Sequence, residues 1–395
     1  MIKSINYYLL IIFAILIPIA YTPNIYLNKS LYTIYSNGIT LLLGLLFALS
    51  FFQYSILKRR NVPNIIVKLL VAIVITAIEF LIFHTGKLNY NTQDLISLLA
   101  VTLGIYIGYT NDFNTNQIKI FIIVFCVFSV VLGYLSIGTY VGSFSVYAPD
   151  YLVDGKNQIG QLLSLCVVLS FYLIFLEEQK IIRVFILTLF ALSFLFMVII
   201  KCKTAILSSL FVIGFIFFKL STTDTKKILF LVGFPLAGII CIFFYKTIIN
   251  GFLEIVGLAG KTSMAEFTTG RSTRNEMAVD YILNNFFTGE LIRYSNIPLI
   301  HNWILLRFTR YGIYVFPFIA FYFSLLFYVL NRIIKTKNWN ISNVGWLIVI
   351  PAYISSMVEP GAPFSPNTIY IIHYILLGIA LNYHHNLRRQ LYNKL

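Results

Sequence analysis

The chain has 395 residues, of which 59% are hydrophobic and only 11% are charged, and its formal net charge is +15. Typical soluble domains have about 25% charged residues, so this composition excludes an ordinary soluble protein. It predicts an all-α, polytopic integral membrane protein whose residues 1–395 form a single transmembrane domain.

About twelve apolar segments follow one another along the chain, each long enough to cross the ~30 Å hydrocarbon core of a bilayer. The third is interrupted by Lys68 and Glu79, and the eleventh is short. The first lacks a small-residue cleavage site, which predicts a retained span rather than a removed signal peptide. The predicted centres are Ile12, Leu46, Val74, Thr102, Val127, Val167, Leu189, Phe211, Gly238, Ile319, Ile348 and Leu376.

Lys and Arg are distributed unevenly between the two sides of these spans. With a cytoplasmic amino terminus, 17 of them lie on inside segments and only five lie on the short outside loops. Because this bias sets orientation, both termini are predicted to be cytoplasmic, and the long loop 246–302, between spans 9 and 10, faces outward. The positive charge then needs no nucleic-acid partner, since it serves topology and attraction to anionic lipids.

The sequence contains no nucleotide-binding glycine loop, no His-Glu-x-x-His and no Asp-rich metal motif, so neither a metal nor a cofactor is predicted. The inside loops are too short for a nucleotide-binding domain, and the energy for any reaction must come with its substrate. The four cysteines lie in or near different spans without a Cys-x-x-Cys pair, which favours packing residues: Cys126, Cys166, Cys202 and Cys241.

The outer loop 246–302 contains a dense set of ionisable residues and one predicted helix. Thr273-Arg-Asn-Glu276 matches a capping box, which predicts an amphipathic helix from about Arg274 to Phe286, closed by Gly289. Its apolar face combines Ala278, Ile282 and Phe286 with Met277 and Tyr281.

Two arginines stand at the start of this helix: Arg271 directly before it and Arg274 in its first turn. A cation there opposes the helix dipole and is unfavourable without an anion. A phosphate at this place would meet free N–H groups, the positive end of the dipole and two guanidinium groups. The alternative is that both arginines reach lipid headgroups or the nearby Glu266 and Glu276.

His301 lies where the loop returns to the membrane, beside Trp303, a residue type suited to the interface. A single histidine there is either a satisfied interfacial residue or a catalyst. Arg307 and Arg310, three residues apart, share one helix face below it, and intramembrane arginines usually mark a functional site. Together these residues favour a phosphate-handling active site.

The order of these motifs resembles the superfamily of O-antigen polymerases and O-antigen ligases. The similarity rests on Gly270-Arg271, a helix ending in Gly289, His301-Asn302, Gly312 at a span start, Lys156-Asn157-Gln158-Ile-Gly160 and Lys203-Thr-Ala205. The last segment has Lys where that superfamily has Arg, and Lys cannot form the bidentate fork.

The resemblance implies a GT-C-like glycosyltransferase in the cytoplasmic (inner) membrane, which polymerises undecaprenyl-pyrophosphate-linked oligosaccharide repeat units into O-antigen or capsule by metal-independent transfer. It implies His301 as the base and Arg271 as a second catalytic residue. The implied pyrophosphate-binding residues are Arg271, Arg274, Lys203, Arg307 and Arg310. Its implied partners are membrane lipids, a chain-length regulator and a flippase.

Two alternatives stay open. A ligase that attaches finished polymer to lipid A-core shares the same motifs, and a flippase or other transporter also has about twelve spans. Transporters more often have repeat-related halves and charges buried at the midplane, whereas the charges of this chain concentrate in one outer loop.

Overall fold

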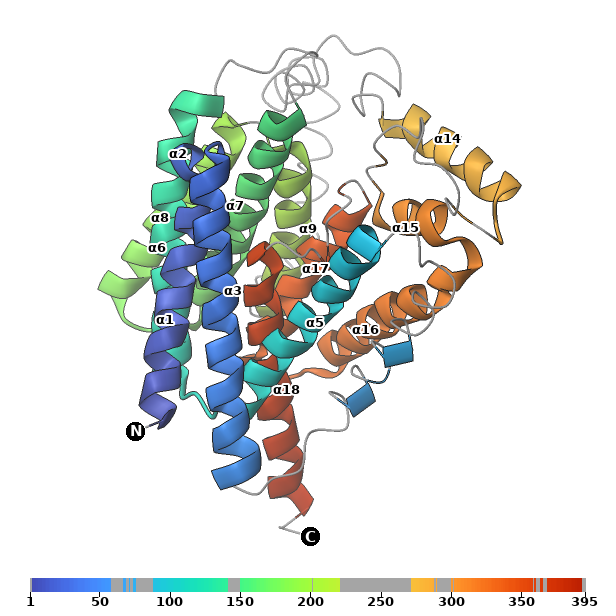
Figure 1. Cartoon of the computed structure of the whole chain (residues 1–395). Coiled ribbons are helices and arrows are strands. Elements are labelled where there is room, and N and C mark those ends of the chain that lie inside the picture. The colour runs from blue at the N-terminus through green and yellow to red at the C-terminus, as the bar shows by residue number, and fades with distance from the viewer. Residues whose placement is uncertain are drawn as a thin grey trace.

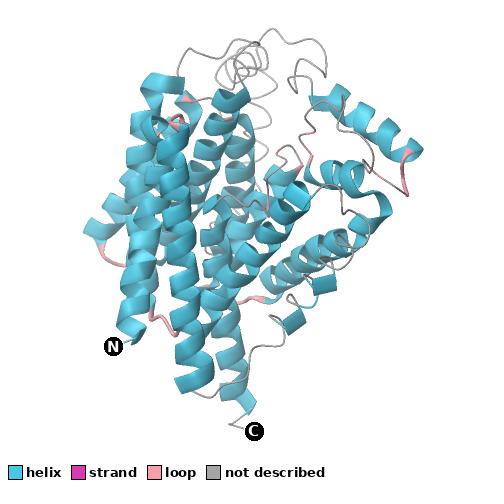
Figure 2. Cartoon of the chain, viewed as in Figure 1, coloured by secondary structure: helices cyan, strands magenta, loops and turns pink. Residues whose placement is uncertain are grey.

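The structure is a computed structural model. It describes residues 2–57, 67–68, 71, 74–75, 88–140, 150–200, 202–220, 271–287, 289, 300, 302–357, 359, 363–364 and 368–392. Within these ranges every regular element is a helix (Figure 2). Five helical stretches of this described part are long and apolar enough to cross a membrane, as an all-α membrane protein requires.

The helices form an elongated bundle whose long members run side by side (Figure 1). In chain order they are α1 (Ile2–Ala20), α2 (Pro23–Tyr26), α3 (Lys29–Phe51), the π-helix η1 (Phe52–Leu57), α5 (Leu88–Thr110), α6 (Thr115–Tyr140), α7 (Asp150–Leu176), α8 (Lys180–Ile199), α9 (Lys203–Leu220), α14 (Arg271–Asn284), α15 (Trp303–Tyr311), the 3₁₀ turn η4 (Gly312–Val315), α16 (Phe316–Lys335), η5 (Ile341–Asn343), α17 (Val344–Ser356), η6 (Thr368–Tyr370) and α18 (Ile371–Tyr392).

Ten of the twelve predicted span centres fall inside described helices of the bundle. Val74 lies in a described helical pair whose surroundings are outside the described residues, and Gly238 lies outside them altogether. The helical character of the chain is therefore confirmed, while the total of twelve spans stays a prediction.

Small residues allow the central helices to approach closely. A Cβ on Gly108 of α5 would lie 1.9 Å from the carbonyl oxygen of Ile375 on α18, and one on Gly378 would lie 2.2 Å from the carbonyl oxygen of Ile105. Apolar burial offers little driving force between helices in lipid, so close backbone packing of this kind holds them together. The cysteines of the described part are buried and free: Cys126, Cys166 and Cys202, with Cys241 outside the described residues.

Both termini lie at one end of the bundle, and α2 and α14 lie at the opposite end (Figure 1). We call the end that carries α2 and α14 the distal end. The start of α7 is also there, because a Cβ on Gly155 would lie 2.8 Å from Cε1 of Tyr26 in α2. Gln161 of α7 accepts a hydrogen bond from Ser355 of α17 at 2.9 Å. The last turn of α17 therefore also lies toward the distal end.

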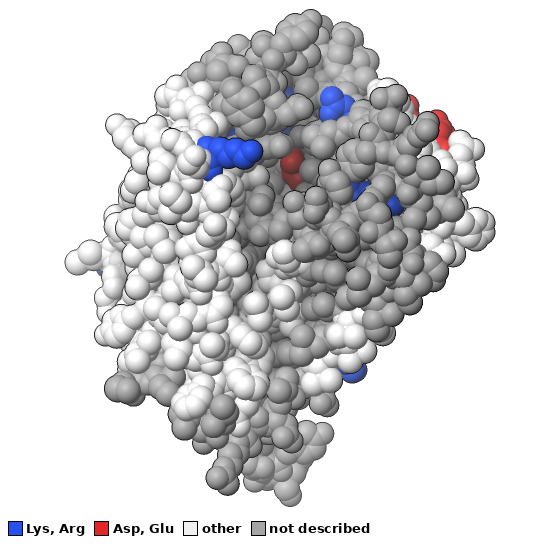
Figure 3. Space-filling view, viewed as in Figure 1, with Lys and Arg blue, Asp and Glu red and all other residues white. Residues whose placement is uncertain are grey.

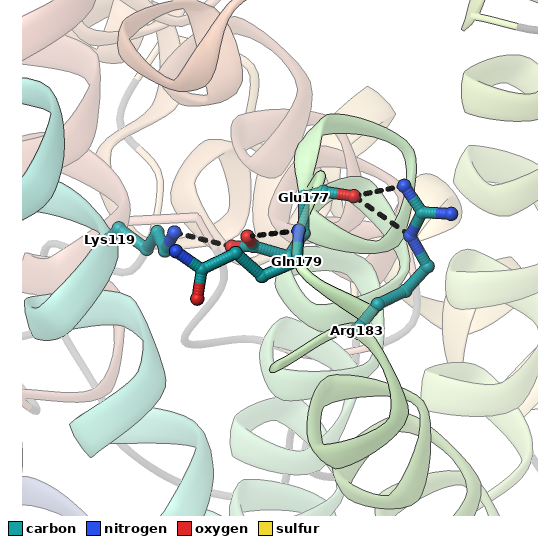
Figure 4. Close-up of polar contacts among 4 residues, drawn as sticks. All are labelled: Lys119, Glu177, Gln179 and Arg183. Atoms are coloured by element: carbon teal, nitrogen blue, oxygen red, sulfur yellow. Dashed lines mark hydrogen bonds and ion pairs between the residues drawn. The ribbon is translucent and has the colours of Figure 1, made fainter. Parts of the chain in front are cut away.

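At the end near the termini, the buried carboxylate of Glu177 holds neighbouring segments together (Figure 4). Glu177 lies in the connection between α7 and α8. Its Oε2 pairs with Lys119 of α6, and its Oε1 accepts from the Gln179 N–H at 3.0 Å. The carbonyl oxygen of Glu177 accepts from Nε of Arg183 at 2.8 Å. Burial raises the pKa of Glu177, but the bonds from Lys119 and the Gln179 N–H outweigh it and lower this pKa below its ordinary value.

Candidate functional site

Helix α14 begins at Arg271, three residues before the predicted start at Arg274. Thr273 is therefore inside the helix, and the prediction that it caps the helix is wrong. A capping side chain contributes only about 1 kcal/mol, which is too little to stop a helix that can extend further. Arg271 still occupies the N-terminal end, although its side chain lies outside the described residues.

The predicted apolar face of α14 is confirmed in its main part. Ala278 is fully buried and Ile282 and Phe286 are partly buried, whereas Met277 is exposed. The helix packs against α15. After its last turn the chain reaches Gly289, which has a positive φ of 57° and contacts the backbone of Gly312 at the end of α15.

Helix α15 is anchored at its start by Asn302. The Asn302 side chain accepts from the Leu305 N–H at 3.0 Å, as an N-cap does, and its Nδ2 donates to the carbonyl oxygen of Met357 at 3.2 Å. Ile300, on the other side of His301, is buried. His301 itself lies outside the described residues, but the chain on both sides of it is held at the distal end.

Trp303 is not an exposed interfacial residue, because its side chain is enclosed by the protein. Its ring is fully buried and stacks on Tyr322 of α16 at 5.0 Å between centroids. Tertiary packing explains the difference, because Phe318 and Phe364 also contact the ring and enclose it in an aromatic cluster.

The two arginines of α15 differ in their surroundings. Arg307 is only 4% exposed, and its guanidinium lies over the Trp303 ring at 5.2 Å, a cation–π contact. Arg310 is partly buried in the last turn, where the helix dipole favours a cation. Arg274, on the packed partner helix α14, is partly buried as well. With Arg271 at the start of α14, four of the five predicted anion-binding residues therefore lie on two helices in mutual contact.

Lys203 is the first residue of α9 and is partly buried at the junction with α7. The preceding Cys202 donates from its thiol to the carbonyl oxygen of Lys156 at 3.4 Å. A Cβ on Gly160 would lie 2.8 Å from Cβ of Cys202 and 3.3 Å from that of Ala205. The segments 156–160 and 203–205, far apart in the sequence, are thus in direct contact.

Glu359 is a residue of this region that sequence reasoning missed. It is 8% exposed and follows α17, where its N–H donates to the carbonyl oxygen of Ser355 at 2.8 Å. Burial raises the pKa of the Cys202 thiol to about 12; the charge of Lys156 acts against this effect and that of Glu359 adds to it. Both charged groups are therefore close to Cys202. The signal available in the sequence was that Glu359 is the only charged residue between Lys337 and Arg388.

Charged side chains of the described part gather mostly toward the distal end on the face shown in Figure 3, with acidic atoms between basic ones. Within the described ranges, no group of three or more His, Cys, Asp or Glu residues is placed to hold a metal ion. Comparisons with protein-family models, with curated proteins and with solved structures find no match to this chain.

Proposed function

We propose that the protein is a membrane glycosyltransferase that polymerises undecaprenyl-pyrophosphate-linked oligosaccharide repeat units at the outer face of the cytoplasmic membrane. The proposal includes twelve spans in a GT-C-like arrangement, cytoplasmic termini and an outward loop 246–302. The distal end is then the outer end.

The observation that carries the proposal is the packing of α14 on α15. Arg271 and Arg274 belong to the first helix, and Arg307 and Arg310 belong to the second. Four guanidinium groups on two packed helices suit a leaving group that bears several negative charges, because positioned cations at a site shielded from water stabilise developing charge strongly. Lys203 contributes a further cation from the start of α9, as a point charge rather than a fork.

The reaction needs one proton acceptor besides these cations. In the proposed step the acceptor's hydroxyl oxygen bonds to the anomeric carbon of the donor, and the bond from that carbon to the pyrophosphate oxygen breaks. The hydroxyl proton passes to His301, and the electron pair of the broken bond leaves with the pyrophosphate, which the arginines hold. The attachment of Asn302 to Met357 supports this role, since it holds the chain beside His301 near the end of α17.

Glu359 is the second candidate for the proton acceptor. Its buried carboxylate belongs to the same region, two residues after Met357. Glu276 and Asp280 of α14 suit this role less well, because those two carboxylates are exposed on a helix surface.

The surface-polysaccharide ladder of a strain lacking the protein tests the function. A single repeat unit on the lipid core supports the polymerase. Long polymer that stays on its lipid carrier indicates a ligase, and repeat units that accumulate on the cytoplasmic side indicate a flippase. An unchanged ladder overturns all three.

A further inference from the structure

Helix α14 has a second apolar surface that faces away from α15. Leu283 and Phe287 are 72% and 70% exposed, and Val279, one turn earlier, is 42% exposed. These three residues repeat every four positions and therefore lie along one side of the helix and its following turn. Ala278 and Ile282, which are buried and partly buried, lie about a quarter turn away on the helix.

The end of this surface lies beside Gly312, within the candidate membrane span Trp303–Lys335. The backbone carbon of Phe287 would be 3.1 Å from a Cβ on Gly312, the residue that ends α15. Helix α16 starts four residues later at Phe316, whose side chain is 52% exposed. Phe323 and Phe327 continue the exposed apolar surface down α16.

The exposed apolar side chains of α14 therefore lie next to a helical stretch, Trp303–Lys335, that is long and hydrophobic enough to span a membrane. The first half of α14 differs from the second half, because Thr273, Glu276 and Asp280 are exposed there. One helix thus presents polar groups at its start and large apolar groups at its end. This pattern suits a helix that enters a lipid surface at a slant, with only its second half in contact with acyl chains.

We propose that Leu283 and Phe287 insert between lipid acyl chains, just below the headgroups of the leaflet at the distal end. The occupant of this surface is the bilayer itself. Insertion holds the second half of α14 at the membrane surface and keeps Arg271 and Arg274 at headgroup level. The proposal requires only that the bundle spans a membrane, and it stands whether or not the protein is a glycosyltransferase.

The test uses the full-length protein with its four cysteines replaced by alanine, reconstituted in vesicles of phosphatidylethanolamine and phosphatidylglycerol. Single cysteines at Leu283→Cys and Phe287→Cys carry an environment-sensitive fluorophore, and Thr273→Cys and Glu276→Cys serve as controls on the same helix. Quenching is measured with lipids brominated on their acyl chains and, separately, with iodide in the water. Thermal unfolding of each labelled variant confirms that the label leaves the fold intact.

The labels at positions 283 and 287 should emit at shorter wavelength than the controls and lose fluorescence to the brominated lipids but not to iodide. The labels at positions 273 and 276 should show the reverse. Strong iodide quenching at 283 and 287 would overturn the proposal in favour of a water-exposed helix. Resistance to both quenchers would also overturn it, because the surface would then be covered by protein.

Discussion

Gly289 and Gly312 meet backbone to backbone at the distal end. A Cβ on Gly289 would lie 2.6 Å from the Gly312 nitrogen, and a Cβ on Gly312 would lie 2.8 Å from the Gly289 nitrogen. Both residues have a φ of 57°, a backbone angle that residues other than glycine adopt only with strain. Two glycines separated by 22 residues therefore define how α14 docks on α15, and with it the placement of the arginines on both helices.

Gly289→Ala and Gly312→Ala should each abolish polymer formation, because the added methyl group forces the two helices apart. The left-handed backbone alone costs about 1–2 kcal/mol. Thermal unfolding in detergent and the polysaccharide ladder measure the two effects. Gly44→Ala on α3 is the matched control, since a Cβ there meets nothing within 4 Å and should leave both readouts unchanged. Normal polymer from both distal variants would contradict the docking argument.

Arg271→Ala should lower turnover by about 10²–10³-fold, the effect seen when one stabilising donor is removed from a transition state. Donor binding should weaken as well, and Arg271→Lys should restore activity only in part because a point charge replaces the fork. Binding of the lipid-linked donor and polymer yield are the measurements. Lys337→Ala, an exposed cation at the end near the termini, is the control. Full activity of Arg271→Ala would exclude Arg271 from the anion site.

His301→Ala should lower turnover by about 10²–10⁴-fold while donor binding changes little, since the arginines hold the pyrophosphate. Wild-type activity should fall in acid, because a protonated imidazole cannot accept the proton. If His301→Ala retains normal polymer, Glu359→Gln should then show the loss in turnover. Glu276→Gln and Asp280→Asn, exposed carboxylates of α14, should have no effect in either case.

Glu177→Gln should destabilise the protein by about 1–3 kcal/mol, because Lys119 loses its ionised partner in a largely buried position. The pKa of Glu177 is lowered in the folded state, so its contribution is present above the unfolded-state value of about 4.5 and is lost as pH falls through the folded-state value. As the pH falls below about 4.5, the melting temperature should therefore decline more steeply for the wild type than for Glu177→Gln. Glu178→Gln, its exposed neighbour, should behave like the wild type.

Orientation is tested by single cysteines and a membrane-impermeant reagent on intact cells. Ser263→Cys and Ser272→Cys should react from outside, whereas Thr223→Cys should not. Asn338→Cys, an exposed position in the connection between α16 and α17, should also stay unlabelled. The reverse pattern would invert the topology and remove the proposed site from the outer face.

Hydrophobicity alone was enough to locate the helices. Ten predicted centres lie in described helices, because a segment of ~20 apolar residues in lipid must satisfy its backbone internally and so becomes helical. The same local logic found the buried face of α14 through Ala278 and Ile282, but the helix ends at Asn284, five residues before the Gly289 that was predicted to close it. It placed the helix start three residues too late, since a capping preference is weak compared with the packing of a whole helix.

The sequence by itself therefore determined an all-helical membrane protein whose polar segment contains one helix with arginines at its start. Only the tertiary structure decided that Trp303 is buried with Arg307 over its ring, that Gly289 contacts Gly312, and that the charge of Glu359 acts on Cys202. The physical reason is the distance along the chain over which each interaction acts. Helix formation and hydropathy act between residues a few positions apart, whereas burial and charge pairing depend on which distant helices pack together.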